Sequence, residues 1–600
     1  MNPGKEEHAA SAGGLGFAMP EEAERFAHVL RLFREGKLGE DDFRRFRLQH
    51  GIYSERFQTD FGLLRVKLPA GVITPEQLEL LADLAEVFSI GSLHLTTRQN
   101  IQLHWLLFED VPEILRRLAE AGLTTREACG NTVRNVTCCP LAGCCPHEAF
   151  DVTPYALATA RYLLRNPMNQ DLPRKFKINF SGCGRWCSLA PLNDVGLVAE
   201  EREDGGRRVK GFRVYVGGGL GPASYVGGLL EDFTPEDRLL ETVASVIRVF
   251  DRLGDRVKMH KNRMRYLVKE MGFQKFKELV LRERRIVQVT QPANFRLSLP
   301  QASSPLKEVE ESFNPAQGVK DEAYLRWFTT NVTAQKQKGY YAVYLSTPAG
   351  DMLAQQVRAV AEVARNHSEE RLVRVTPLQG LVFRWIPGRN VPEVYWKLKE
   401  AGLASPGALS VASVVGCTGT ASCNLAITNS HRVAKEVRKK FLELGLDMDG
   451  DLKNLAVKLS GCPNSCGHHA IGAVGLVGST QRIEGILTPA YLMLLGGKTG
   501  LDARIGKPFM RVPAKKLPEV LVRLFELYKA EKAEGEDFHN WIDRVLRGGG
   551  ASVIKNAEDL RRELEKAAKL PSPREDPKAY MDWGSEEKFV AKTARGECAA

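Results

Sequence analysis

Twelve cysteines carry the clearest chemistry in this 600-residue chain, because most of them fall into pairs with fixed spacing. In the C-terminal half, Cys417 and Cys423 are separated by five residues and Cys462 and Cys466 by three, with 38 residues between the pairs. Thiolates bind zinc and iron–sulfur clusters. Paired zinc ligands are usually separated by about two to four residues, so the five-residue spacing in Gly-rich segments favours a [4Fe–4S] cluster. A zinc site and buried, unliganded cysteines are the alternatives.

The same spacing occurs 279 positions earlier, in the N-terminal half. The four residues concerned are Cys138, Cys144, Cys183 and Cys187. Thiolates at repeated positions predict a second cluster there. Cys139 and Cys145 offer an alternative first pair, with 37 residues before Cys183. The spacing of 38 matches the C-terminal half, so Cys138 and Cys144 are the expected ligands.

Longer blocks of sequence also repeat, which indicates an internal duplication. Residues 94–122 resemble residues 374–402, and both read as alternating strand residues, a turn and a helix with apolar residues at helical spacing. Residues 177–199 match residues 456–478 at an offset of 279. A strand–helix–strand–helix order used twice predicts an α+β fold with two ferredoxin-like half-domains.

The repeats and the changes in composition also divide the chain into regions. A stretch rich in Pro, Ser and Gln separates the two halves, as in a linker, and the end of the chain is charged and then Pro-rich, as in a surface tail. The expected regions are an N-terminal arm (1–49), half-domain 1 (50–125), cluster domain 1 (126–285), the linker (286–329), half-domain 2 (330–403), cluster domain 2 (404–550) and the tail (551–600).

Composition and charge exclude several function classes. Lys and Arg total 84 and Asp and Glu total 73, and the net charge of +11 favours an anionic partner. The chain has no run of five basic residues, so nucleic acid is not the expected partner. It has no run of 18 apolar residues, so no membrane span is expected. The first 17 residues do not read as a secretory signal, so we expect a cytoplasmic protein with reduced thiols.

Several motifs together resemble the sirohaem-containing nitrite and sulfite reductase family, over about residues 20–550. The last cysteine pair lies in SGCPNSCG (460–467). The other motifs are GIYSERF (51–57), LLRVKLPAG (63–71), HLTTRQNIQLH (94–104), NTVRNV (131–136), LPRKFK (172–177) and VGGGLG (216–221). The resemblance implies two half-domains packed about a pseudo-twofold axis and two α/β domains that enclose sirohaem and a [4Fe–4S] cluster. It also implies that the Cys466 thiolate ligates both the cluster and the sirohaem iron.

The resemblance further implies cations around the substrate and the sirohaem. Arg holds an oxyanion with a planar fork, and Lys can donate protons to it. The residues implied as catalytic are Arg65, Arg134, Lys175 and Lys177. Those implied to bind the sirohaem carboxylates are Arg98, Gln102 and Arg174. His94 and His104 either join them or are ordinary strand residues.

The activity implied is the six-electron reduction of sulfite to sulfide. Lys175-Phe176-Lys177 resembles the sulfite-reducing members, whereas nitrite-reducing members more often have Asn at the last position. Reduction of nitrite to ammonia is the alternative, and a non-catalytic iron–sulfur electron-transfer protein is the alternative from another class. No flavin or nicotinamide domain is evident, so electrons are expected from ferredoxin or another acidic carrier, or from a separate flavoprotein. A monomer or small homo-oligomer is expected.

The N-terminal cysteines depart from the family pattern, which most single-chain members show only in the C-terminal half. Under the repeat offset, the catalytic cations have no counterparts. The replacements are Ser413 for Arg134, Asn454 for Lys175, Ala456 for Lys177 and, with one gap, Ala342 for Arg65. A pocket without these cations should not hold an anion or deliver protons. We therefore expect a second site that does not turn over substrate, whether it holds a cluster alone or a cluster with sirohaem.

Overall fold

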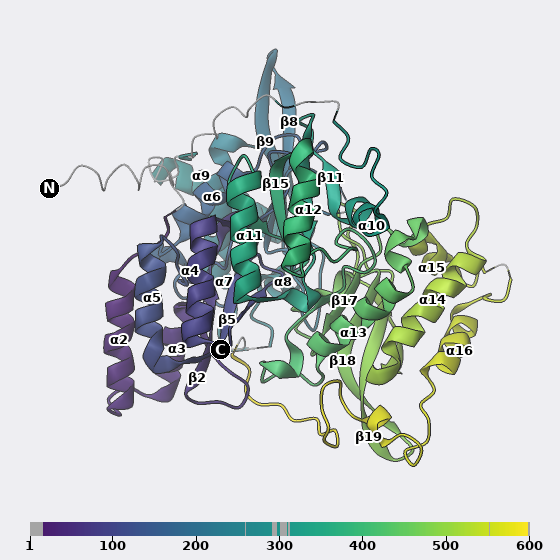
Figure 1. Ribbon diagram of the computed structural model, residues 1–600. Helices are drawn as coiled ribbons and strands as arrows, with labels where there is room; N and C mark the ends of the chain where they lie inside the picture. The colour runs from purple at the N-terminus through teal and green to yellow at the C-terminus, as the bar shows by residue number, and fades with distance from the viewer. Residues whose placement is uncertain are drawn as a thin grey trace.

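The computed structural model describes residues 16–185, 187–258, 260–290, 297–299, 309, 313–550 and 552–597. These residues contain four five-stranded sheets, which form two related pairs. The N-terminal helices (purple) lie at one side of the molecule and the C-terminal helices (yellow) at the other (Figure 1). The duplication expected from sequence is therefore visible in the order of the sheets.

The two ferredoxin-like half-domains exchange one strand each. Their sheets have the orders β1-β2-β5-β4-β13 and β11-β12-β15-β14-β3. Strand β13 (Asp351–Leu353) pairs with β4, and β3 (Val72–Ile73) pairs with β14. This reciprocal exchange joins the two halves about a pseudo-twofold axis. The other strands are β1 (Ile52–Ser54), β2 (Phe61–Val66), β4 (Ser92–Leu95), β5 (Ile101–Leu107), β11 (Val332–Ala334), β12 (Tyr340–Leu345), β14 (Val373–Val375) and β15 (Leu381–Pro387).

Helices from both half-domains share one apolar core. Helix α4 (Pro75–Phe88) begins at Thr74, whose side chain accepts a hydrogen bond from the Gln77 amide in a capping box. Pro75 at the first helical position has no amide to leave unpaired. The helix then packs against α11 of the other half. The remaining helices of the half-domains are α5 (Val111–Glu120), α11 (Ala354–His367) and α12 (Val391–Glu400).

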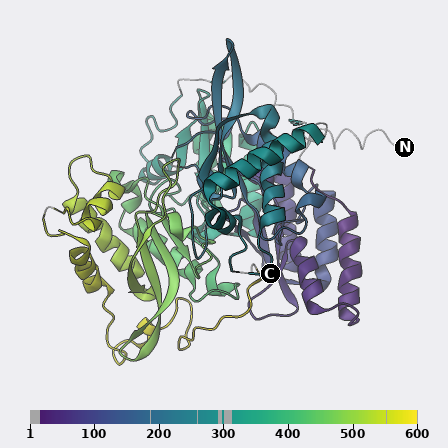
Figure 2. The same cartoon turned by 180° about the vertical axis from the view of Figure 1, so that it is seen from behind.

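The two cluster domains repeat one sheet order, β10-β9-β8-β7-β6 and β20-β19-β18-β17-β16. In each sheet the three strands nearest the cysteines are parallel and the outer pairs are antiparallel. The β8–β9 hairpin projects from the molecule (Figure 2). The strands are β6 (Thr137–Cys138), β7 (Ile178–Ser181), β8 (Val195–Asp204), β9 (Arg207–Val216), β10 (Gly228–Pro235), β16 (Val415–Gly416), β17 (Val457–Ser460), β18 (Val474–Ile483), β19 (Ile486–Leu495) and β20 (Lys507–Pro513).

Helices pack on these sheets and extend the cores of both halves. The described part of the expected N-terminal arm packs on the fold, because Phe26 and Phe43 from its two helices are buried in the core of the half-domains. The helices are α2 (Glu21–Arg34), α3 (Glu40–Gln49), α6 (Thr153–Leu163), α7 (Leu239–Leu253), α8 (Met264–Met271), α9 (Phe273–Thr290), α13 (Ser430–Glu443), α14 (Leu517–Glu531) and α15 (Phe538–Leu546).

Two segments differ from the sequence-based expectation. Helix α10 (Glu322–Asn331) begins inside the expected linker, and its Trp327 is fully buried; residues 291–296, 300–308 and 310–312 lie outside the described residues. The expected surface tail contains helix α16 (Ala557–Ala568), which buries two leucines in the core. The chain then returns across the molecule (Figure 1), and its residues 596–597 contact α3 and β1. None of the described helices is long and apolar enough to cross a membrane.

Candidate functional site

The C-terminal cysteines lie in loops that follow β16 and β17. Carboxyl ends of neighbouring parallel strands meet at one edge of a sheet, so these loops converge. The four thiols line one cavity that encloses about 1390 Å³ of space, its open mouth included. The Cys417 Sγ accepts a hydrogen bond from the Gly461 amide at 3.2 Å and lies 3.1 Å from the Ser430 hydroxyl. The thiols concerned are Cys417, Cys423, Cys462 and Cys466.

Cations from the N-terminal half line the same cavity, opposite these thiols. They come from β2, from the turn after β4 and from the loops that precede β6 and β7. Among the described lining residues, Glu597 is the single carboxylate. The structure thus brings the expected catalytic residues to Cys466, and we call this space the cation-lined cavity. Its cations are Arg65, Arg98, Arg134, Lys175 and Lys177.

Burial and mutual repulsion leave these cations poorly compensated. Burial lowers the pKa of Arg98 to about 9; Asp194 acts in the opposite direction, and the nearby charges of Arg134, Arg263 and Arg65 lower the pKa further. Burial, followed by the charges of Arg98 and Arg263, holds the pKa of Lys177 well below its usual value. The Nε atoms of Arg65 and Arg98 are buried without a hydrogen-bond partner. A cavity with this charge fits a polyanion, such as a tetrapyrrole with several carboxylates.

Arg98 is also held by the protein itself. Its guanidinium donates to Asn193 Oδ1 at 2.7 Å, to the Ile178 carbonyl at 3.1 Å and to the Asn135 carbonyl. These bonds join half-domain 1 to cluster domain 1 at the edge of the cavity. Gln102, from the adjacent strand β5, lines the cavity beside it.

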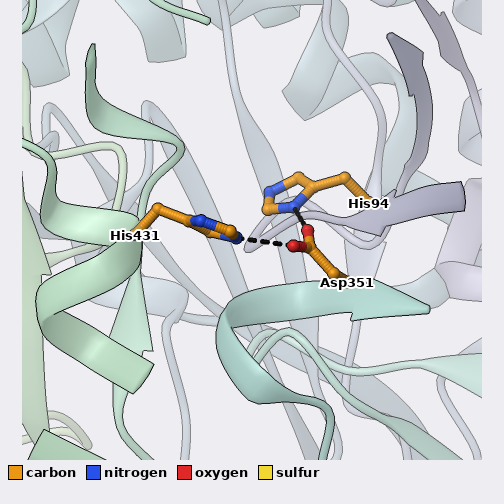
Figure 3. A group of neighbouring side chains, drawn as sticks. All are labelled: His94, Asp351 and His431. Atoms are coloured by element: carbon orange, nitrogen blue, oxygen red, sulfur yellow. Dashed lines mark hydrogen bonds and ion pairs between the residues drawn. The ribbon is translucent and has the colours of Figure 1, made fainter. Parts of the chain in front are cut away.

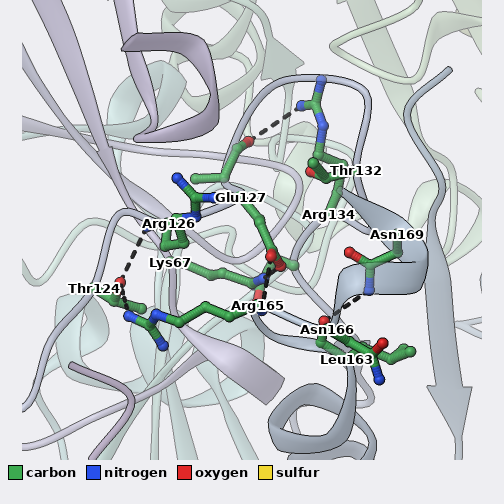
Figure 4. A network of polar contacts seen from close by, with 12 residues as sticks. Lys67, Thr124, Arg126, Glu127, Thr132, Arg134, Leu163, Arg165, Asn166 and Asn169 are labelled. Carbon is green, nitrogen blue, oxygen red and sulfur yellow. Dashed lines mark hydrogen bonds and ion pairs between the residues drawn. The ribbon is translucent and has the colours of Figure 1, made fainter. Parts of the chain in front are cut away.

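The loop that carries Arg134 is supported by a buried ion pair (Figure 4). Arg134 donates from Nε to the Gly130 carbonyl at 3.0 Å. Glu127, at the start of this loop, is fully buried and lies 3.4 Å from the Lys67 ammonium. The Glu127 carboxylate also accepts from the Arg165 amide at 2.8 Å. Lys67 belongs to the LLRVKLPAG motif, so that motif also positions Arg134.

Two residues expected at the sirohaem do not reach the cavity. His104 Nδ1 lies 2.8 Å from the buried carboxylate of Glu55. Strand β5 is irregular at this end, because Trp105 has a φ of 60° and the pairing with β2 shifts register. Arg174 donates to Asn131 Oδ1 at 3.4 Å and is not among the described lining residues. His104 thus fits the alternative of an ordinary strand residue, and the position of Arg174 gives its expected sirohaem role no support.

His94 lines the cavity, and the Nδ1 edge of its ring contacts Asp351 from the second half of the chain (Figure 3). His94 Nδ1 lies 2.9 Å from Asp351 Oδ1, and His431 Nε2 lies 2.7 Å from Asp351 Oδ2. The three groups could hold a metal ion by proximity. However, the Lys435 ammonium lies 2.9 Å from the same Asp351 oxygen as His431 and shares its charge. The cluster therefore acts as an ionic clamp between the halves.

The C-terminal segment reaches the cation-lined cavity, which no sequence pattern indicated. The Glu597 carboxylate lies 2.5 Å from Arg47, 3.2 Å from Arg44 and 3.2 Å from the Ser54 amide nitrogen. Upstream, the Ala594 amide donates to the carbonyl of Asn424, next to Cys423, at 2.9 Å. The segment thus covers a cluster loop from a position far away in sequence.

The N-terminal cysteines meet in a different set from the expected one. Cys187 hydrogen-bonds with Cys139 and Cys183, and Cys183 also hydrogen-bonds with Cys145. The first pair that meets Cys183 and Cys187 is therefore Cys139 and Cys145, the 37-residue alternative, and not the preferred Cys138 and Cys144. Side chains alternate between the faces of a strand, so a shift of one residue at β6 turns the thiol of residue 138 into the core and that of residue 139 toward Cys187.

A second cavity lies beside Cys187 and encloses about 1700 Å³, its open mouth included. We call it the mirror cavity. Asn454 and Ala456 line it as expected, whereas Ser413 and Ala342 do not. The counterpart of Arg65 is Tyr344, since Leu64 pairs with β5 where Val343 pairs with β15. Tyr344 lines the mirror cavity in place of that arginine.

Comparisons with known proteins identify the family. The model described as the nitrite and sulphite reductase 4Fe-4S domain matches residues 129–287 and 408–549, and the model of the ferredoxin-like half-domain matches residues 57–121 and 333–401. The chain belongs to the nitrite and sulfite reductase family. The resemblance found in its motifs and the expected fold class are confirmed.

Individual members of the family are similar along most of the chain. The assimilatory ferredoxin-dependent nitrite reductase of Haloferax mediterranei is 28% identical, with 87% of this chain and 88% of that protein covered. The ferredoxin–nitrite reductase of Synechococcus elongatus is 30% identical over 77% of this chain and 85% of its own. The solved structure of the Mycobacterium tuberculosis NirA protein has a TM-score of 0.74 at 26% identity and covers 92% of this chain and 97% of its own.

Proposed function

We propose that this chain is a ferredoxin-dependent sulfite reductase with sirohaem and a [4Fe–4S] cluster in the cation-lined cavity. One observation carries the proposal: the Cys466 thiol faces a cavity lined by five cations and one carboxylate among the described residues. The thiols of the C-terminal half would hold the cluster. Cys466 would also ligate the sirohaem iron, and Arg98 and Gln102 would bind the sirohaem carboxylates.

The residues of the chain would bind and orient the substrate. When bound, the sirohaem with its cluster would relay the six electrons that reduced ferredoxin delivers and would offer an iron to the sulfur of sulfite. Arg65 and Arg134 would hold the oxyanion, because a guanidinium presents a planar set of donors. The ammonium groups of Lys175 and Lys177 would hold protons near the oxygens that leave as water. The buried ion pair of Lys67 and Glu127 keeps Arg134 in place for this role.

Sulfite is favoured over nitrite by the second lysine of Lys175-Phe176-Lys177, which resembles the sulfite-reducing members. Nitrite remains the second candidate, since relatives named as nitrite reductases are as similar to this chain as those named as sulfite reductases. Ferredoxin is supported as the donor by the relatives' names and by the net charge of +11, which attracts an acidic carrier. Reduced thiols fit a reducing compartment such as the cytoplasm.

The test is turnover of both anions by protein purified without oxygen. Reduced ferredoxin is supplied, and sulfide and ammonia are measured as products. The proposal expects a higher kcat/KM with sulfite than with nitrite and an absorption spectrum with isobacteriochlorin bands. A higher kcat/KM with nitrite would change the substrate assignment. Absence of those bands and of both products would overturn the proposal.

A further inference from the structure

The two cysteine-bearing sheets are equivalent, but not at one constant offset. Strand β6 pairs with β7 through Thr137 and Asn179, and β16 pairs with β17 through Val415 and Lys458. Asn179 and Lys458 are 279 positions apart, whereas Thr137 and Val415 are 278 apart. One residue has therefore been gained or lost before the second pair of cysteines. The first pair must be compared at the shorter offset.

Backbone hydrogen bonds extend this equivalence through the whole cluster loop. The amide of Cys138 donates to Gln99 Oε1 at 2.8 Å, and that of Gly416 donates to Gln379 Oε1 at 3.0 Å. Cys138 is thus the counterpart of a glycine, and Cys139 that of Cys417. The further matched bonds are Cys139 N to Phe180 O (3.0 Å) with Cys417 N to Leu459 O (3.3 Å), Cys145 N to Leu141 O (2.9 Å) with Cys423 N to Gly419 O (3.0 Å), and Ala149 N to Gly182 O (2.9 Å) with Ile427 N to Gly461 O (2.8 Å).

The thiols of the N-terminal set lie where this match of the backbones predicts. Those of Cys139, Cys183 and Cys187 are in hydrogen-bond contact, and the Cys145 thiol contacts that of Cys183. Each of the four therefore stands where a thiol of the C-terminal set stands. Cys187, like Cys466, is exposed toward a cavity.

The neighbouring cysteines have other surroundings. Cys138 is buried in the apolar core of cluster domain 1 and hydrogen-bonds with Thr153. The Cys144 thiol donates to the Leu141 carbonyl at 3.3 Å and packs with Tyr340 and Trp385. These two thiols are structural, and they provide a matched control for any experiment on residues 139 and 145.

The mirror cavity lacks the features that bind an anion. Its described charged lining consists of three lysines and three carboxylates, and the catalytic Lys177 is replaced by Ala456. Two of the lysines are already paired, Lys532 with Asp451 and Lys498 with Asp502. A lining with equal numbers of lysines and carboxylates does not attract sirohaem, which carries eight carboxylates, or a sulfite dianion.

We infer that Cys139, Cys145, Cys183 and Cys187 hold a second [4Fe–4S] cluster, with no sirohaem beside it and no substrate turnover. The inference rests on the match between the two cluster loops and, for the choice of iron, on the cluster proposed for the C-terminal set, but not on the proposed reaction. Iron is preferred to zinc for two reasons. The hydrogen bonds of the ligand loops match those of the C-terminal set, and the first pair in both sets has five intervening residues, which is wider than zinc pairs usually have.

The test compares the double variants Cys139→Ser/Cys145→Ser and Cys138→Ser/Cys144→Ser with the unaltered chain, all purified without oxygen. Metals and acid-labile sulfide are counted, and the reduced proteins are examined by electron paramagnetic resonance. The unaltered chain should hold about nine irons and eight sulfides, from two clusters and one sirohaem. The first variant should hold about five irons and keep its sirohaem bands, and the second should keep about nine.

The outcomes separate this inference from the proposed function. About five irons in the unaltered chain, zinc in place of iron, or loss of iron from the Cys138→Ser/Cys144→Ser variant would overturn the second cluster. If the Cys139→Ser/Cys145→Ser variant does not fold, the iron count and the number of cluster signals in the unaltered chain still decide. Turnover and sirohaem content of the unaltered chain report on the C-terminal site alone.

Discussion

The cation-lined cavity and the mirror cavity are built on equivalent sheets, yet their linings differ in charge. The first combines five cations with one carboxylate, and the second combines three lysines with three carboxylates, among the described residues. The differences lie at matched positions, where Arg65 corresponds to Tyr344 and Lys177 corresponds to Ala456. A duplicated scaffold has thus kept thiols on both sides, and anion-binding groups on one side only.

The comparison teaches that the scaffold and the chemistry are separable. The cluster loops depend on strand ends and backbone hydrogen bonds, which both halves retain. Anion binding depends on a few long, cationic side chains that line the cavity. A substitution can remove such a side chain and leave the strands unchanged. Burial lowers the pKa of Lys458 in the mirror cavity to about 8 and also holds the pKa of Lys177 in the cation-lined cavity well below its usual value, so the two cavities differ in the number of their cations and not in how firmly a buried lysine keeps its charge.

The largest expected effect comes from the matched thiols Cys466 and Cys187. Cys466→Ser should reduce sulfite turnover to background and shift the sirohaem spectrum, because the thiolate that would join the cluster to the iron is removed. Cys187→Ser should lower the iron content but leave appreciable turnover. Turnover and absorption spectra of both variants check this. Equal loss of activity in the two variants would contradict a division between a catalytic and a non-catalytic side.

A smaller effect is expected when a catalytic cation is exchanged for a neutral donor. Lys177→Asn should lower kcat/KM for sulfite about 5- to 150-fold, since a charged hydrogen bond contributes about 1–3 kcal/mol. The loss with nitrite should be smaller. Asn454→Ala in the mirror cavity is the control and should leave both values unchanged. Equal losses with the two anions for Lys177→Asn would remove the reason for assigning sulfite.

The C-terminal segment should have a moderate effect on cofactor retention. Glu597→Gln removes the charge that pairs with Arg44 and Arg47, and the pairs are mostly buried. We expect the contact between the C-terminal segment and Arg44 and Arg47 to be weaker by about 1–3 kcal/mol. Sirohaem should then be lost faster on dilution, which absorbance measures. Glu586→Gln, in the exposed part of the same segment, is the control. Unchanged sirohaem loss in Glu597→Gln would show that the segment does not retain the group.

The smallest effect is expected at the ionic clamp. Burial raises the pKa of Asp351, but hydrogen bonds from His431 and His94 outweigh it and hold that pKa below its usual value. A carboxyl with a lowered pKa stabilises the fold above its unfolded pKa of about 3.9, and this contribution is lost as the pH falls. Asp351→Asn should therefore lower stability by less than about 1 kcal/mol at pH 7.

The pH dependence supplies the check on that prediction. The difference in Tm between the unaltered chain and Asp351→Asn should shrink as the pH is lowered from about 4 to about 3. Thermal unfolding at several pH values measures it. A difference that grows toward low pH would contradict the ionic account of the clamp.

Much of the fold could be predicted from the sequence because repeated blocks at a shared offset require repeated elements. The cavity could be predicted because Cys466, Arg65 and the lysines lie in motifs that resemble one family. Which cysteines form the N-terminal thiol set could not be predicted. Cys138 and Cys139 are adjacent, and only the alternation of side chains along β6 decides which thiol points toward Cys187. Contacts between residues that are far apart in the sequence could not be predicted either.

Glu597 illustrates that last point. Its partners Arg44 and Arg47 are more than 500 positions away, and an isolated glutamate near a chain end has no pattern that indicates a contact. For His104 the sequence left two interpretations open, and a local feature favours the ordinary strand residue: the left-handed backbone of Trp105 interrupts the strand, and His104 contacts the Glu55 carboxylate.

The central claim is that one of two equivalent cavities holds sirohaem, and extraction of sirohaem per chain tests it most directly. Sirohaem is extracted into acidic acetone from the unaltered chain and from Cys187→Ser, and is quantified against protein. The account predicts about one sirohaem per chain in both, since only the cation-lined cavity fits a group with eight carboxylates. About two per chain, or a loss of sirohaem on replacing Cys187, would contradict it.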